Sequence, residues 1–304
     1  MNGGWAGQAE RGNRFALRLI LWIALRLGRT ASRLVLYPIT LYFLIKARPQ
    51  RVASRRFLTR VQGHPAGLFQ VARHIHCFAA TILDRVFLLT GRQEALEVRV
   101  HNPQLISERV AVGQGFLLLG SHLGSFEVLR VLAVEQQQLP LKILMDPMHN
   151  QIITKVLDGL NPAVAATVLP LGTPRTLLAV KEALDAGSMV GLLGDRCGPD
   201  ETGITCRFFE RPARFPTGPM VLAALTQVPV VLAFGLYRGG NHYDLHFEDL
   251  AERVELDRRD REGAVCGWVQ RYAERLEYHT RLAPYNWFNF YDFWNDEDSI
   301  QGPR

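Results

Sequence analysis

The 304-residue sequence is poor in cysteine and lacks the motifs of several common enzyme classes. Its cysteines show neither Cys-x-x-Cys spacing nor the density of a secreted disulfide-rich domain, so we expect a reducing compartment. No Gly-x-Ser-x-Gly surrounds Ser121 or Ser125, and the strained serine elbow of α/β-hydrolases is therefore not indicated. The four cysteines are Cys77, Cys197, Cys206 and Cys266.

A transmembrane helix of ordinary length is also not indicated at the N-terminal end. The uncharged run Leu34 to Ile45 contains Pro38 and is shorter than the roughly 20 apolar residues that span a bilayer. A cleavable signal peptide fits poorly, because arginines interrupt the apolar region. One alternative stays open, in which residues 11–33 and 34–45 together form a single kinked, tilted spanning segment.

Charge is distributed unevenly along the chain. The sequence has 35 Lys and Arg against 29 Asp and Glu, a net charge of +6, and much of the excess lies before position 60. No nucleic-acid-binding motif accompanies this charge, so an anionic lipid surface or an acidic partner protein is the favoured contact.

Residues 11–33 have the pattern of a helix that lies in a membrane interface. Six arginines fall within an arc of roughly 120° of a helical projection, and apolar side chains fill much of the rest. We expect basic residues after position 45 to anchor this region on the cytoplasmic side. The alternative is that the apolar face packs on the globular domain. The arginines of the stripe are Arg11, Arg14, Arg18, Arg26, Arg29 and Arg33, and the anchoring residues are Lys46, Arg48, Arg51, Arg55 and Arg56.

The rest of the chain predicts an α/β fold with a largely parallel central sheet. Short apolar runs typical of strands alternate with helical stretches, and charged amphipathic helices are expected over residues 64–92 and 254–279. We expect two parts in the chain: N-terminal membrane-associated helices over residues 1–60, and one α/β domain over residues 61–304. The expected strands are residues 116–119, 141–145, 165–169, 189–193, 228–236 and 243–247.

His122 is the main candidate for a reactive group. It falls in the turn between the strand at 116–119 and the following helix, and Glu127 lies in the first turn of that helix. A histidine in a loop can then meet the carboxylate, which would orient it as a general base. The alternative is an ordinary polar turn. The triplet His74-x-His76-Cys77 resembles a metal cluster, but neighbouring positions of a helix point in different directions, so we expect no metal there.

Four blocks, read in order, resemble the bacterial lipid A biosynthesis acyltransferases, the lauroyl and myristoyl transferases of the inner membrane. They are the histidine turn, residues 194–209 beginning Gly-Asp-Arg-Cys-Gly-Pro, residues 213–223 containing Phe-Pro-Thr-Gly-Pro, and the aromatic tail at 284–291. The family dyad His-x-x-x-x-(Asp/Glu) corresponds to His122 and Glu127. Arg196 and Cys197 stand where the family has Gln and Asp, and the tail also differs. The sequence therefore resembles a divergent branch associated with aryl polyene or other glycolipid pathways.

The resemblance implies a glycerolipid-acyltransferase-like fold and a catalytic pair, His122 and Glu127. It implies transfer of a fatty or polyene acyl chain from acyl carrier protein or coenzyme A to a lipid-linked acceptor at the inner face of the bacterial inner membrane, with no cofactor or metal. The basic end suits an acidic carrier protein. A non-catalytic lipid-binding or scaffold protein and a lipid hydrolase stay as alternatives. The substrate-binding residues it implies are Asn150, Asp195, Arg196, Phe208, Phe209, Thr217 and Gly218.

Overall fold

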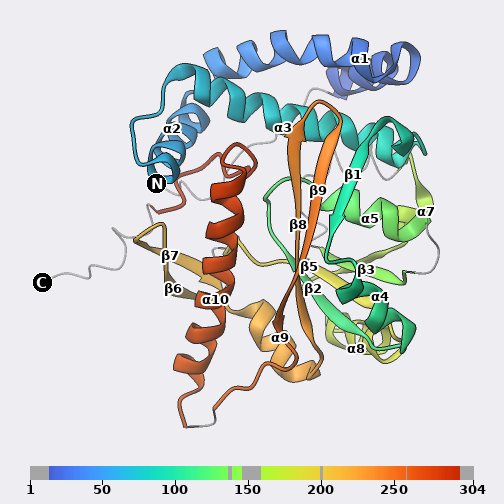
Figure 1. Ribbon diagram of the computed structural model, residues 1–304, viewed down its shortest axis with the longest axis vertical. Helices are drawn as coiled ribbons and strands as arrows, with labels where there is room; N and C mark the ends of the chain where they lie inside the picture. Colours follow the sequence, from blue (N-terminus) through green and yellow to red (C-terminus); the bar gives the residue numbers. More distant parts are fainter. Residues whose placement is uncertain (1–13, 136–138, 146–158, 199–200, 258, 295–304) are drawn as a thin grey trace, which may run out of the picture.

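The computed structural model describes residues 14–135, 139–145, 159–198, 201–257 and 259–294. A seven-stranded sheet forms the centre, in the order β1-β9-β8-β2-β5-β3-β4, and β6 and β7 form a separate antiparallel hairpin (Figure 1). The strands are β1 (Glu97–His101), β2 (Phe116–Gly120), β3 (Leu141–Met145), β4 (Val168–Pro170), β5 (Met189–Leu193), β6 (Gly203–Phe208), β7 (Arg211–Pro216), β8 (Val230–Gly239) and β9 (His242–Ala251).

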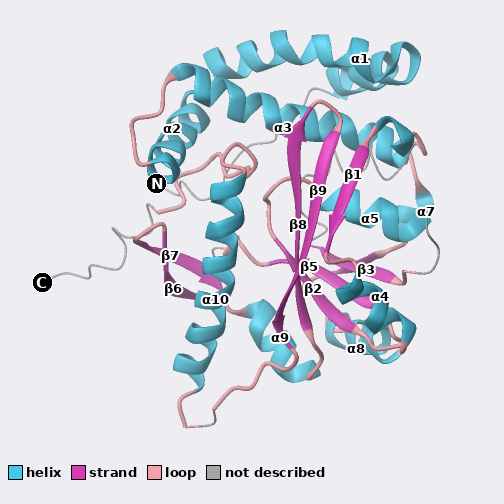
Figure 2. Cartoon of the chain, viewed as in Figure 1, coloured by secondary structure: helices cyan, strands magenta, loops and turns pink. Residues whose placement is uncertain are grey.

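Helices cover both faces of the sheet and one of its ends (Figure 2). They are α1 (Arg14–Lys46), α2 (Arg48–Gln62), α3 (Leu68–Leu89), α4 (Gln104–Ala111), α5 (Phe126–Glu135), α7 (Pro162–Ala165), α8 (Thr176–Asp185), α9 (Gly218–Thr226) and α10 (Arg261–Leu282), with a short 3₁₀ helix at Gln93–Ala95.

Alternate side chains of β2 enter different cores, as the two-residue period of a strand requires. Leu117 and Leu119 belong to a large cluster that includes residues of α9 and α10. Phe116 and Leu118 instead pack with residues of α4 and α5. Because both faces are buried, β2 is a continuous apolar run, which is the pattern of a central parallel strand.

The predicted α/β fold with a largely parallel sheet is confirmed, with differences at its edges. β8 and β9 form an antiparallel hairpin, so β9 and its parallel partner β1 run against the other five strands. Neither β1 nor the β6-β7 hairpin was predicted. The strand expected over residues 165–169 is partly wrong, because residues 162–165 form α7 and β4 begins at Val168.

Residues 14–46, which include most of the two N-terminal segments expected over residues 11–33 and 34–45, form α1, and α1 lies along α3 (Figure 1). Gly28 interrupts the helical backbone with a φ of 76°, a conformation that glycine adopts at low cost. Within the described residues, no helix is both long and apolar enough to cross a bilayer.

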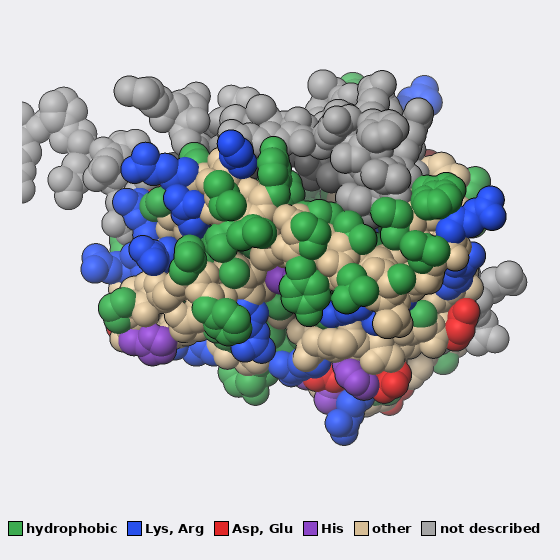
Figure 3. Space-filling view, turned by 90° about the horizontal axis from the view of Figure 1, so that it is seen from above, with side chains coloured by type: hydrophobic (Ala, Val, Ile, Leu, Met, Phe, Trp, Pro, Cys, Tyr) green, Lys and Arg blue, Asp and Glu red, His purple; other side chains and the backbone are tan. Residues whose placement is uncertain are grey.

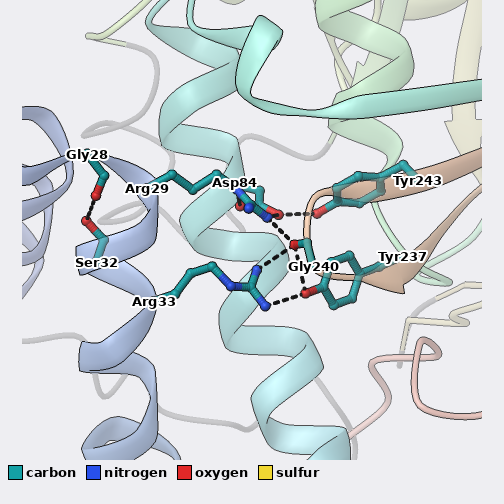
Figure 4. A network of polar contacts seen from close by, with 8 residues as sticks. All are labelled: Gly28, Arg29, Ser32, Arg33, Asp84, Tyr237, Gly240 and Tyr243. Carbon is teal, nitrogen blue, oxygen red and sulfur yellow. Dashed lines mark hydrogen bonds and ion pairs between the residues drawn. The ribbon is translucent and has the colours of Figure 1, made fainter.

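Of the predicted arginine stripe, Arg26 is exposed, whereas Arg29 and Arg33 contact the domain. Arg29 donates two hydrogen bonds to the buried carboxylate of Asp84 on α3, at 2.8 and 3.0 Å. Arg33 donates to the Tyr237 hydroxyl at 2.7 Å and to the Gly240 carbonyl at 2.8 Å (Figure 4). These two arginines therefore fix α1 to the domain, and they are not available to lipid headgroups. The free-energy cost of removing the two guanidinium groups from water is offset by the carboxylate, carbonyl and hydroxyl groups that accept their hydrogen bonds.

Apolar side chains of α1 and α2 are instead exposed on the outer surface. Figure 3 shows a band of hydrophobic side chains on the face seen from above, with Lys and Arg side chains near its ends. Such a contiguous band is unusual on a protein surface that contacts only water. The exposed large residues of these helices are Trp22, Leu27, Leu34, Tyr37, Leu41, Tyr42, Phe43, Ile45 and Val52.

Candidate functional site

The site is centred on a hydrogen bond between His122 and Asp195. The Nδ1 atom of His122 lies 2.8 Å from Oδ1 of Asp195, and the same oxygen accepts the backbone N–H of His122 at 3.1 Å. Asp195 is fully buried, whereas 32% of the His122 side chain is exposed. We assign the ring proton to Nδ1, because an ionised carboxylate can only accept. The lone pair of His122 is then on Nε2.

Strand register explains why these two residues meet. β2 and β5 are parallel neighbours, and Gly120 at the end of β2 is paired with Leu193 at the end of β5. His122 and Asp195 each lie two residues beyond this pair, so both leave the sheet at the same edge and the same level. The carboxyl ends of parallel strands are where ligand sites form in α/β sheets.

Backbone contacts with two distant segments hold the loop that carries His122. Gly124 has a φ of 73°, and a Cβ atom there would lie 1.9 Å from the Gly235 carbonyl oxygen of β8. Gly124 N–H donates to the Asn286 carbonyl at 2.8 Å, and the His122 carbonyl accepts from Phe288 N–H at 3.0 Å. Only glycine fits this close approach, and the histidine is therefore held by main-chain contacts on both sides.

Trp287 supports the carboxylate from the C-terminal segment. Its indole Nε1–H donates to Oδ2 of Asp195 at 2.9 Å, and its carbonyl lies 3.0 Å from Nε2 of His74 on α3. Nδ1 of His74 in turn lies 2.8 Å from the Ser54 hydroxyl of α2. Asp195 thus accepts three hydrogen bonds, and a chain of buried groups fixes its orientation.

The electrostatic surroundings favour a neutral imidazole beside an ionised carboxylate. Burial and the nearby Arg196 guanidinium lower the pKa of His122, and they outweigh the opposing effect of Asp195. Burial alone would raise the pKa of Asp195, but His122, Arg196 and the Trp287 indole N–H together lower it. An unprotonated Nε2 at neutral pH is what a general base requires.

The carboxylate that orients His122 in the structure is Asp195, which corrects the predicted pairing with Glu127. In the described part of the chain, the polar contact of Glu127 is with Arg130 on the next turn of α5, at 3.5 Å. Arg130 itself also donates to Thr167 and to the Val164 carbonyl. No described contact joins Glu127 to His122.

Arg196 was predicted to hold a phosphate, but its guanidinium binds the C-terminal segment. It donates to the Asn289 side chain and to the Phe288 carbonyl, both at 2.9 Å. Its role in this geometry is to join the loop after β5 to the tail and to lower the pKa of His122 through its charge.

The other predicted substrate-binding residues that the structure describes have contacts of their own. Phe208 and Phe209 were expected to line an acyl groove, but both are buried among aromatic rings of the core. Thr217 donates to the Thr202 carbonyl at 3.0 Å, and Gly218 is exposed at the start of α9. No described contact connects either of them with His122. Asn150 lies outside the described residues.

Arg85 of α3 is a feature of the site that sequence reasoning missed. Its positive charge is close enough to contribute to the lowered pKa of His122. Its Nε atom is buried and has no hydrogen-bond partner within the described residues. The sequence gives no sign that Arg85 lies near His122. The helix α3 precedes the sheet in the chain, and only the tertiary structure places it over the strand ends.

The metal-like triplet on α3 does not converge. His74 points toward Ser54 and Trp287, whereas His76 lies 3.2 Å from the Thr40 hydroxyl of α1. Burial raises the pKa of the Cys77 thiol to about 11, so it is not a ready thiolate ligand. All four cysteines are reduced thiols in the structure.

A family model described as bacterial lipid A biosynthesis acyltransferase matches residues 20–295, which is most of the chain. No curated protein matches the sequence significantly.

Proposed function

Because the chain belongs to the bacterial lipid A biosynthesis acyltransferase family, and is therefore an acyltransferase acting on lipid A-like substrates, we propose that His122 is its general base and that Asp195 orients it. The observation that carries this proposal is the 2.8 Å contact between His122 Nδ1 and the buried Asp195, with 32% of the His122 side chain exposed. Asp195 fixes the tautomer, so that Nε2 is the atom that accepts a proton.

The reaction we propose is direct transfer of an acyl chain from a thioester to a hydroxyl. Nε2 of His122 accepts the proton of the acceptor hydroxyl while its oxygen attacks the thioester carbonyl. The tetrahedral intermediate collapses, the carbon–sulfur bond breaks, and the imidazolium returns the proton to the leaving thiolate. Asp195 stabilises the imidazolium between these steps.

Arg85 is our candidate for an anion contact beside His122. Its guanidinium charge and its unpaired buried Nε support this role, because acyl donors of the carrier-protein or coenzyme A type carry phosphate. We expect Arg85→Gln to raise the KM for the donor about tenfold or more with a small change in Tm. The matched control is Arg253→Gln, at an exposed position after β9. An unchanged KM would contradict this contact.

We further propose that the protein binds the membrane surface as a peripheral protein, with the apolar band of α1 and α2 facing the lipid. Two features support this orientation: the band is exposed, and basic residues beside it lie on the surface. Lipid burial of such side chains is favourable, and the basic residues would meet anionic headgroups. The exposed basic residues include Lys46, Arg48, Arg55 and Arg56.

Flotation with anionic vesicles tests the membrane proposal. Replacing Leu34, Tyr37 and Leu41 together by Ser should move most of the protein from the vesicle fraction to the soluble fraction. The control replaces Val112 and Leu225, two exposed apolar residues near α4 and α9, by Ser and should float like the wild type. Equal flotation of the two variants would contradict the assigned face.

The experiment that tests the catalytic proposal measures thioester consumption by full-length protein in detergent, with and without a lipid acceptor. We expect consumption that depends on acceptor, and a loss of about 10²- to 10⁴-fold in His122→Ala with little change in Tm. Equal consumption without acceptor would identify a thioester hydrolase. No consumption with any acyl-carrier-protein or coenzyme A donor would favour a non-catalytic lipid-binding role.

A further inference from the structure

A second group of polar side chains lies on the sheet edge formed by β1 and β9. His101 is the last residue of β1 and is paired in register with His246 of β9, and Asp244 lies two residues before His246. Paired positions on neighbouring strands, and positions two apart on one strand, project from the same face. The rings of His101 and His246 stack at 4.2 Å with an interplanar angle of 2°.

The Nε2 atoms of these two rings lack hydrogen-bond partners within the described residues. Nε2 of His101 and Nε2 of His246 are both buried, and neither has a partner in the described residues that meets hydrogen-bond geometry. The nearest acidic atom is Oδ1 of Asp244, at 3.5 Å from Nε2 of His101. Two buried nitrogen atoms without hydrogen-bond partners are energetically unfavourable. A ligand that binds both atoms would remove this cost.

We propose that His101, Asp244 and His246 bind a divalent transition metal ion of the zinc class. One ligand atom from each of the three residues lies within 4.8 Å of the others. In a tetrahedral zinc site with bonds of 2.0 to 2.2 Å, ligand atoms are separated by about 3.4 Å. The 3.5 Å between His101 and Asp244 is close to this value, and the third ligand atom, on His246, lies within 4.8 Å of the other two.

The surroundings of the three residues suit a metal site. Oδ2 of Asp244 accepts a hydrogen bond from Nε of Arg238 at 2.7 Å, which leaves Oδ1 directed toward the histidines. Such outer contacts orient ligating carboxylates in metal sites. All three residues are half-buried, so an ion can reach them and a water molecule can complete the coordination.

The expected effect of the ion is structural. β1 is an edge strand that pairs only with β9 in the sheet order. A metal that binds both strands would stabilise this edge, and the folded state as a whole, in proportion to its affinity. This inference does not depend on acyl transfer, because none of the three residues contacts His122 or Asp195 in the described structure.

Zinc binding by tag-free, full-length protein in detergent tests the proposal. After chelator treatment, Zn²⁺ is titrated calorimetrically near pH 7.5, where a histidine of ordinary pKa is neutral. We expect about one ion per chain, a rise in Tm on addition, and an affinity about 10- to 100-fold lower in His101→Ala and in His246→Ala. Co²⁺ in place of Zn²⁺ should give a visible absorption band of tetrahedral coordination, which both variants lose.

His242→Ala is the matched control. His242 lies on β9 four residues before His246, is exposed, and contacts Glu97 at 3.0 Å, so it tests for unspecific binding at the same sheet edge. It should bind Zn²⁺ like the wild type. Absence of binding at millimolar Zn²⁺, unchanged affinity in both His101→Ala and His246→Ala, or loss of binding in His122→Ala would each overturn the proposal.

Discussion

Two fully buried carboxylates, Asp84 and Asp195, show how one kind of residue serves two purposes in this protein. Asp84 accepts two hydrogen bonds from the Arg29 guanidinium and one from the Tyr243 hydroxyl at 2.8 Å, as Figure 4 shows. Asp195 accepts from the backbone and ring of His122 and from the Trp287 indole. Both carboxylates are satisfied by three or more donors.

The difference lies in the partner. Arginine keeps its proton under all ordinary conditions, so the bond between Arg29 and Asp84 only joins α1 to α3. Histidine gains and loses a proton near neutral pH, and the His122 side chain is partly exposed to solvent. A buried carboxylate is therefore structural when its partner has a fixed charge, and it can assist proton transfer when its partner titrates.

Asp195→Asn should produce the largest effect on activity. The amide cannot select the tautomer of His122, so we expect kcat to fall by about 10²- to 10⁴-fold while Tm changes little. The matched control is Glu127→Gln, which removes the charge of the other candidate carboxylate and should cost much less. Both are measured with the acceptor-dependent thioester assay. A larger loss in Glu127→Gln than in Asp195→Asn would show that the geometry of the resting site does not identify the catalytic carboxylate.

Asp84→Asn should affect stability instead of catalysis. The substitution leaves the charged Arg29, whose side chain is 12% exposed, with a neutral and weaker acceptor. We therefore expect a loss of about 3 to 5 kcal/mol in unfolding free energy. Chemical denaturation in detergent measures this loss. Activity per folded molecule should stay close to that of the wild type, and a selective fall in kcat would mean that the two carboxylates are not functionally distinct.

His74 is a buried histidine near His122, and it predicts how the stability of the protein depends on pH. Burial lowers the pKa of His74 to about 4, against the opposing hydrogen bond to Trp287. Above about pH 6.5 both folded and unfolded states hold a neutral ring. As pH falls from there toward about 4, only the unfolded chain takes up the proton, so stability decreases by about 1.4 kcal/mol per pH unit.

His74→Gln isolates this contribution. The glutamine amide can still donate toward the Trp287 carbonyl but does not titrate, so the variant should lose stability less steeply as pH falls. Urea unfolding of both proteins over the same pH series gives the difference. Parallel curves for the two proteins would contradict the assignment.

Arg33→Gln should have the smallest effect. Arg33 hydrogen-bonds a hydroxyl and a carbonyl near the surface, and its loss should cost about 1 kcal/mol of unfolding free energy. Arg26→Gln, at an exposed position of the same helix, should stay within about 0.5 kcal/mol of the wild type. Equal costs for the two variants would show that the contacts of Arg33 do not hold α1 to the domain.

The sequence determined the elements that are fixed by local patterns. Buried strands such as β2, β3 and β5 were predicted almost to the residue, because short apolar runs between glycines or polar turns have few other stable forms. His122 could be placed at the end of β2 for the same reason. The family was also readable, because four blocks occur in the family order along the chain.

Only the tertiary structure decided which residues meet. The contact between His122 and Asp195 depends on β2 and β5 being neighbours, although β3 and β4 lie between them in the chain. The orientation of α1 likewise depends on Asp84 and the β8-β9 turn, which draw two arginines inward and leave apolar side chains outside. Local patterns fix which segments become strands or helices. Strand order and the pairing of buried charges depend on residues far apart in the sequence, so no local pattern contains them.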